Sequence, residues 1–206
     1  MPMDKGDVLY FEAAVLDDEE LSWDAQKIGA VIDALGEAGL VPEGEIDPMQ
    51  WAATSRKPCR FRGATGRYRL VVKDSGGWRW DTPASTLMQT RFRNRPEAVA
   101  ELIDAVRAVI GVATPYYGCT WRKVQQHPPW WMRTHHPFAA LDGRALQFFS
   151  VRYLDVHNGG QPFSDPPCVS ESLAGGQLLI GKLPAFGEAD GAALLELADY
   201  LQPKFD

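Results

Sequence analysis

A cysteine, an aspartate and a histidine in the second half of the chain are of the types that carry out nucleophilic chemistry. Cys119 would be the thiol nucleophile, His157 its base, and Asp155 the carboxylate that orients the imidazole. Asp155 and His157 are two positions apart, so on an extended strand their side chains would share one face. The set matches no local cysteine-protease signature, although catalytic groups need not be close in sequence. A polar cluster at the end of a strand, without catalytic function, is the competing interpretation.

The sequence predicts neither a metal site nor a cofactor. His127, His135 and His136 share one segment but lack the HExxH arrangement of a helical zinc site, and the three cysteines lack a paired CxxC. The glycine pairs at 159–160 and 175–176 belong to no GxGxxG pattern and precede no Lys-Ser or Lys-Thr. They therefore indicate turns rather than phosphate-binding loops.

The net charge of −6 conceals two oppositely charged regions. Residues 1–50 hold 13 acidic residues against 2 lysines, and residues 51–100 hold 11 basic residues against 3 acidic ones. The acidic region would steer the approach of a basic partner. It would equally complement the arginine-rich strands of its own chain. The sequence leaves both interpretations open.

Single-stranded nucleic acid is a third class of partner that the basic region brings into consideration. Its arginines and lysines alternate with aromatic residues such as Phe61, Tyr68 and Trp78, a pattern that serves phosphate contact and base stacking. The sequence pI of about 5.2 argues against this function, because such domains are usually basic as a whole. The basic residues concerned are Arg56, Lys57, Arg60, Arg62, Arg67, Arg69, Arg79, Arg91, Arg93 and Arg95.

Two adjacent tryptophans, Trp130 and Trp131, stand in a proline-flanked segment without helical or strand periodicity. Tryptophan is enriched at protein interfaces, so the pair could anchor a partner. The same pair could equally hold this segment as a lid over the sheet.

The elements that must position these residues follow from hydrophobic periodicity and from turn residues. Helices are expected after Ser22, which would be the N-cap, over 96–110, and over about 192–201. Strands are expected at 7–16, 67–73, 86–93, 115–124, 145–156 and 177–183. Consecutive strands between helices favour an α+β fold. We expect one domain spanning residues 1–206, with an antiparallel or mixed sheet and about three helices packed mainly on one face.

The location expected from the sequence is cytoplasmic. No apolar run approaches the roughly 20 residues of a membrane helix. The N-terminus lacks the basic start and apolar core of a secretory signal. Three widely spaced cysteines, Cys59, Cys119 and Cys168, favour free thiols over a disulfide framework.

Three segments give the chain a resemblance to a known class: SGGWRWDT (75–82), PYYGCTW (115–121) and LAGGQLLIGKLP (173–184). With the predicted helix before the second segment, their layout resembles the α+β immunity proteins of bacterial polymorphic-toxin and type VI secretion systems. The resemblance implies a protein without enzymatic activity that binds one cognate toxin and blocks its active site. A nuclease acting in the cytoplasm is the toxin class it suggests, and such a toxin is expected to be basic.

The charge clusters and the paired tryptophans then predict the toxin-contacting residues, which are Asp17, Asp18, Glu19, Glu20, Glu43, Trp130 and Trp131. The alternatives from other classes are a small hydrolase or transferase using Cys119, His157 and Asp155, and a single-stranded nucleic acid binder. The sequence predicts no oligomeric state.

Overall fold

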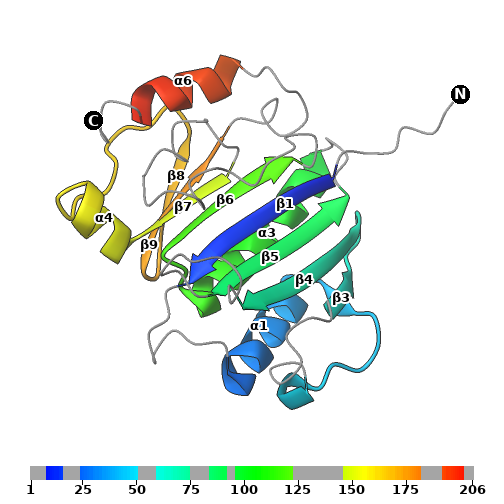
Figure 1. Ribbon diagram of the computed structural model, residues 1–206. Helices are drawn as coiled ribbons and strands as arrows, with labels where there is room; N and C mark the ends of the chain where they lie inside the picture. Colours follow the sequence, from blue (N-terminus) through cyan, green and yellow to red (C-terminus); the bar gives the residue numbers. More distant parts are fainter. Residues whose placement is uncertain are drawn as a thin grey trace, which may run out of the picture.

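The chain folds around one antiparallel sheet with helices on both of its faces, as the computed structural model shows (Figure 1). The structure describes residues 8–15, 24–50, 59–74, 84–91, 96–122, 146–181 and 192–201. The strands are β1 (Val8–Val15), β2 (Val41–Pro42), β3 (Cys59–Arg62), β4 (Arg67–Asp74), β5 (Ala84–Arg91), β6 (Tyr117–Arg122), β7 (Leu146–Ser150), β8 (Val169–Leu173) and β9 (Gly176–Ile180). The helices are α1 (Ala25–Glu37), α3 (Pro96–Ala113), α4 (Val151–His157) and α6 (Ala192–Leu201). The predicted α+β class is confirmed.

The first strand lies in the middle of the sheet. The strand order is β2-β3-β4-β5-β1-β6-β7-β9-β8, and every pairing is antiparallel. Phe11 of β1 stands opposite Met88 of β5 on one side and opposite Thr120 of β6 on the other. The strand predicted at 7–16 is therefore confirmed, and it occupies the centre of the sheet.

Helix α1 forms where the apolar period predicted it, but its cap differs. Asp24 is the N-cap, and its carboxylate accepts a hydrogen bond from the backbone N–H of Lys27 at 2.7 Å. The prediction of Ser22 as the cap was therefore wrong. Ile28, Val31 and Leu35 are buried, and the helix ends before Gly39, whose φ of 84° suits a residue without Cβ.

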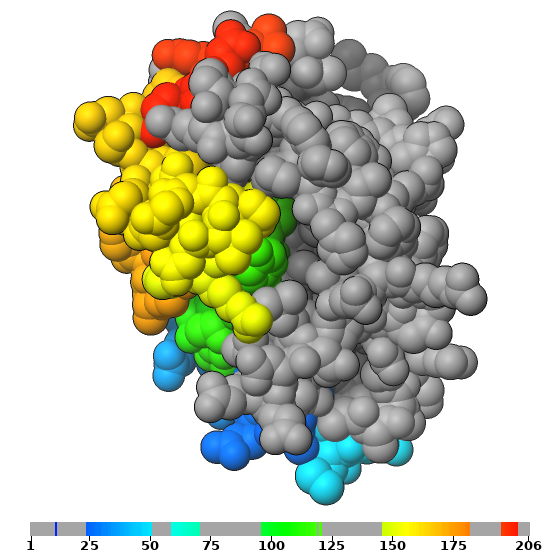
Figure 2. All heavy atoms as spheres, turned by 60° about the vertical axis from the view of Figure 1, so that its left-hand side comes forward, coloured from blue at the N-terminus to red at the C-terminus, as the bar shows by residue number. Residues whose placement is uncertain are grey.

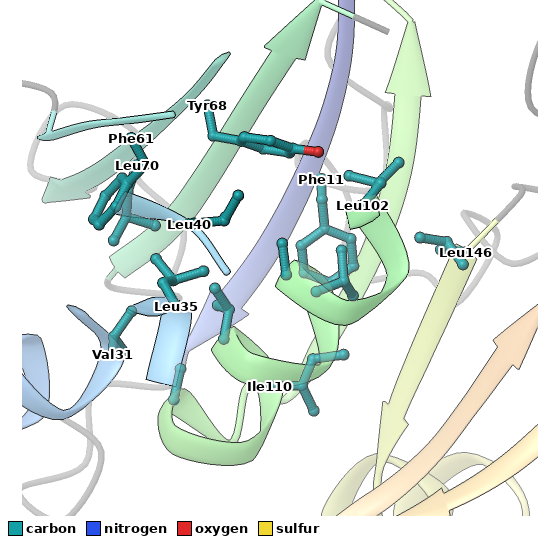
Figure 3. Close-up of a cluster of buried hydrophobic side chains, with 14 of the residues drawn as sticks. Phe11, Val31, Leu35, Leu40, Phe61, Tyr68, Leu70, Leu102, Ile110 and Leu146 are labelled. Atoms are coloured by element: carbon teal, nitrogen blue, oxygen red, sulfur yellow. The ribbon is translucent and has the colours of Figure 1, made fainter. Parts of the chain in front are cut away.

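The larger core lies between one face of the sheet and helices α1 and α3 (Figure 3). Figure 3 shows Phe11 of β1 under α3, with Leu102 and Leu146 nearby, and Phe61, Leu70 and Leu35 grouped toward α1. Both helices turn their apolar stripes onto alternate residues of the strands, as a period of two requires. The helix predicted over 96–110 is confirmed and continues to Ala113.

A second core lies on the opposite face, at the β6–β7–β9 end of the sheet. Tyr117, Phe149 and Leu179 point away from the first core and pack with residues of α4 and α6. In Figure 2 this side of the molecule comes forward, with α4 in yellow and α6 in red at the surface. The sequence predicted helices mainly on one face, whereas the described helices divide between the two faces, with α1 and α3 on one and α4 and α6 on the other. Within the described part of the chain, no helix has the length and apolarity needed to cross a membrane.

The run 145–156 is not the single strand that its apolar character predicted. It is strand β7 followed directly by helix α4, and Ser150 is the N-cap, accepting from the backbone N–H of Tyr153 at 3.0 Å. The short strands β3 and β8 fall outside the ranges in which the sequence predicted strands. The segment SGGWRWDT (75–82), one of the three that carry the family resemblance, lies outside the described residues.

Candidate functional site

Glu43 lies beside the arginine-rich hairpin of β3 and β4. Its backbone N–H donates to the carbonyl of Arg60 at 2.8 Å. Its carboxylate oxygen Oε1 lies 3.2 Å from Nε of Arg67 and 3.5 Å from Nε of Arg62. This acidic residue is therefore complemented by its own chain, as one of the two interpretations of the charge asymmetry expected.

Four arginines project from the outer face of this hairpin, the face opposite the first core. Arg60 is directly across from Arg69, and Arg62 is directly across from Arg67. All four are exposed, whereas the residues alternating with them are buried. We call these four residues, Arg60, Arg62, Arg67 and Arg69, the arginine grid.

The aromatic residues of the same two strands point the other way. Phe61 is fully buried and Tyr68 is 3% exposed, and both belong to the first core. Alternation along a strand forces this arrangement, because the arginines occupy the opposite parity. The aromatic rings of β3 and β4 therefore do not provide a stacking surface beside the arginines.

Glu101 of α3 fixes the turn that joins β3 to β4. Its carboxylate accepts hydrogen bonds from the Thr65 backbone N–H at 2.9 Å, the Thr65 hydroxyl at 2.7 Å and the Tyr68 hydroxyl at 2.7 Å. Burial acts to raise the pKa of Glu101, but these hydrogen bonds to the charged form outweigh it and the pKa is lowered. The carboxylate of Glu101, 36 residues from Thr65 in the sequence, thus fixes the turn between the two strands that carry the arginine grid.

His157 and Asp155 do not share a face, because both lie in helix α4 rather than in a strand. Two positions on a helix are about 200° apart. Nε2 of His157 lies 3.2 Å from the Tyr116 hydroxyl, and its ring packs on Tyr153 at a centroid distance of 4.5 Å. Burial lowers the pKa of His157. The predicted pairing of Asp155 with His157 through a strand was wrong.

Cys119 occupies a central position in β6, opposite Glu12 of β1 and Gln147 of β7. Its side chain lies outside what the structure describes. Gln147 is fully buried, and its Oε1 accepts from the Tyr117 hydroxyl at 3.0 Å. Within the described ranges, no three His, Cys, Asp or Glu side chains gather in a way that would hold a metal ion.

Six of the seven predicted toxin contacts fall outside the described residues, and they stay predictions. They are Asp17, Asp18, Glu19, Glu20, Trp130 and Trp131. Two interactions were not predicted from sequence. They are the hydrogen bonds between Glu101 and the β3–β4 hairpin, and the contact between Tyr116 and His157. Both join residues more than 30 positions apart, and nothing in their local sequence indicates the partner.

No known protein-family profile matches this sequence, and no curated protein matches it. Among solved structures, the fold is similar to that of the Pseudomonas aeruginosa type VI secretion system (T6SS) protein PA0821. The TM-score is 0.53 and the sequence identity 8%, and the likeness covers 97% of this chain and 76% of that one. At this identity the likeness establishes a shared fold, from the first strand to the last helix.

Proposed function

We propose that this protein is an immunity protein that binds and neutralises a cognate toxin of a secretion system. The observation that carries the proposal is the fold shared with a T6SS protein along 97% of the chain. The layout of the three segments at 75–82, 115–121 and 173–184 supports the same class. The proposed toxin is a nuclease that acts in the cytoplasm, and the proposed mode of action is obstruction of its active site.

The acidic run Asp17–Glu20 and the tryptophans Trp130 and Trp131 are the proposed contact residues. A nuclease needs basic residues to hold the phosphate backbone of its nucleic acid substrate. Acidic side chains of an inhibitor would complement those basic residues. The tryptophans would supply the buried anchor that tight interfaces need. Glu43 would enter such an interface together with Arg62 and Arg67, because its carboxylate already lies against both guanidinium groups.

Co-expression with the gene immediately upstream tests the proposal. The expected result is that the upstream product alone arrests growth, that this protein restores growth, and that the two co-purify in equal amounts. A neighbour that is not toxic and forms no complex contradicts the proposal.

Charge reversal then tests the proposed contact residues. Changing Asp17, Asp18, Glu19 and Glu20 to lysine should weaken the complex by at least about tenfold, as loss of steering and of several charged contacts requires. Changing Asp33 and Glu37 to lysine is the control, because these acidic residues lie on the exposed face of α1. Equal affinity in all three proteins would exclude the acidic run as a contact while leaving the immunity function intact.

A further inference from the structure

The arginine grid places like charges directly opposite one another on neighbouring strands. Arg60 pairs in register with Arg69, and Arg62 with Arg67. Cross-strand neighbours lie about 5 Å apart at Cβ, and like charges at this separation destabilise a sheet. An anion held between the opposed arginines would offset this repulsion.

One half of the grid already holds a carboxylate. Glu43 Oε1 lies within 3.5 Å of both Arg62 and Arg67. Among the described residues, no carboxylate forms an ion pair with Arg60 or Arg69, although both side chains are exposed. The contact of Glu43 with Arg62 and Arg67 shows that a carboxylate fits between two opposed arginines of the grid. Arg60 and Arg69 are opposed in the same register and can receive a carboxylate from another molecule.

The lack of a stacking surface beside the arginines favours protein carboxylates over nucleic acid as the ligand. Phe61 and Tyr68, the aromatic residues of these strands, are buried in the core, so they offer no base-stacking surface next to the arginines. The planar guanidinium fork binds carboxylate and phosphate alike, but the anion that the grid already holds is the carboxylate of Glu43. We propose that the arginine grid is a docking surface for clustered carboxylates of a partner protein.

The exposed carboxylates of α1 do not join two copies of this chain through the grid as a closed dimer. The exposed carboxylates Asp33 and Glu37 lie on the outer side of α1, which packs on the opposite face of the sheet from the grid. A contact between the grid of one copy and α1 of another would be head-to-tail. It would leave the grid of one molecule and the α1 of the other unoccupied. The carboxylates of α1 therefore do not make a second copy the closed partner of the grid, and this inference stands independently of the immunity proposal.

The test is fluorescence anisotropy at physiological ionic strength with a labelled peptide of alternating Glu and Ser. Three variants are compared with the full wild-type chain. Arg60→Gln/Arg69→Gln removes the unoccupied half of the grid. Arg60→Lys/Arg69→Lys keeps the charge and removes the forks. Arg152→Gln is the control, because Arg152 is an exposed arginine of α4, outside the grid. Far-UV circular dichroism confirms that each variant is folded.

We expect the Gln double variant to bind the peptide about tenfold more weakly or worse, and the Lys double variant several-fold more weakly. The Arg152 variant should bind within about twofold of wild type. The inference is overturned if wild type does not bind the peptide, or if the Lys double variant binds as wild type does. It is also overturned if a labelled oligothymidylate binds more tightly than the peptide and loses affinity in the same variants, since the grid would then hold nucleic acid.

Discussion

The carboxylate of Glu101 and the hydroxyl of Tyr68 lie 2.7 Å apart and join helix α3 to strand β4 across 33 residues of sequence. The same carboxylate accepts two hydrogen bonds from Thr65. In Glu101→Gln the amide nitrogen would face donors, and at least one donor would lose its acceptor. We expect a loss of about 1 to 3 kcal/mol in the free energy of unfolding, measured with urea. Asp33→Asn, on the exposed side of α1, should change it by less than about 0.5 kcal/mol.

The same carboxylate makes stability depend on acid pH. The pKa of Glu101 is lowered in the folded protein from its ordinary value of 4.5, so the unfolded state binds the proton more tightly. This contribution is fully present above pH 4.5 and is lost as the pH falls through the folded pKa. The stability difference between wild type and Glu101→Gln should therefore shrink below that pH. A difference that stays constant across this range would contradict the role of the charged form.

His157 should titrate below the usual range. Burial lowers its pKa from 6.5, so the neutral imidazole is favoured in the folded state. Its contribution to stability is then present above pH 6.5 and is lost as the pH falls through the folded pKa. The carbon-bound ring protons of His157, followed by NMR and assigned with His157→Gln, should show a midpoint below 6.5. A midpoint at or above that value would mean that the ring is more hydrated than its packing on Tyr153 implies.

Gly176 and Gly36 should respond to alanine with opposite signs. A Cβ at Gly176 would lie 2.2 Å from the Phe149 carbonyl oxygen and 2.8 Å from Ser150 Cα, both of them backbone. Gly176→Ala should therefore destabilise the protein by about 3 kcal/mol or more, because the β7–β9 pairing must shift. A Cβ at Gly36 meets nothing within 4 Å, and Gly36→Ala in helix α1 should stabilise by about 0.5 to 1 kcal/mol. Thermal unfolding of the two variants checks both signs.

Arg107 and Glu171 tie helix α3 to the edge strand β8. Nε of Arg107 donates to Oε2 of Glu171 at 2.9 Å, and Nη2 donates to Oε1, so the pair is bidentate. A double-mutant cycle with Arg107→Met and Glu171→Gln should give a coupling of about 1 kcal/mol, because both side chains are partly solvated. The coupling should fall as salt is added. Coupling near zero at low salt would show that this ion pair does not help to hold β8 against α3.

Local sequence predicts the elements that have one covered face and a clear period. Tyr68 and Leu70 alternate with arginines, which indicates both the strand and the side of it that is buried. The apolar run around Phe148 and Phe149 conceals the change from β7 to α4, because β7 is buried on both faces and shows no alternation. Ser150, a good N-cap inside an apolar run, is the signal that could have placed the start of the helix.

The site is less predictable than the fold because its contacts are non-local. The local charge of Glu43 indicated a surface open to a partner, whereas the fold places its carboxylate against Arg62 and Arg67. The alternation of Arg60 and Arg69 with buried residues predicts an exposed row of arginines. Only the register between β3 and β4 turns that row into directly opposed pairs. Charge along a sequence therefore predicts which residues are available, and strand pairing decides which of them meet.

The central position of β1 has a consequence for how the chain is made. This strand leaves the ribosome before both strands with which it pairs, which are residues 84–91 and 117–122. At about 5 to 20 residues per second, the roughly 110 residues from Phe11 to Thr120 take on the order of 5 to 20 s to synthesise. Both edges of β1 lack their partners until β5 has been synthesised, and the edge that faces β6 lacks its partner for the whole interval. Unpaired strand edges are prone to aggregate. Newborn chains of this protein should therefore depend on chaperones until β6 has emerged.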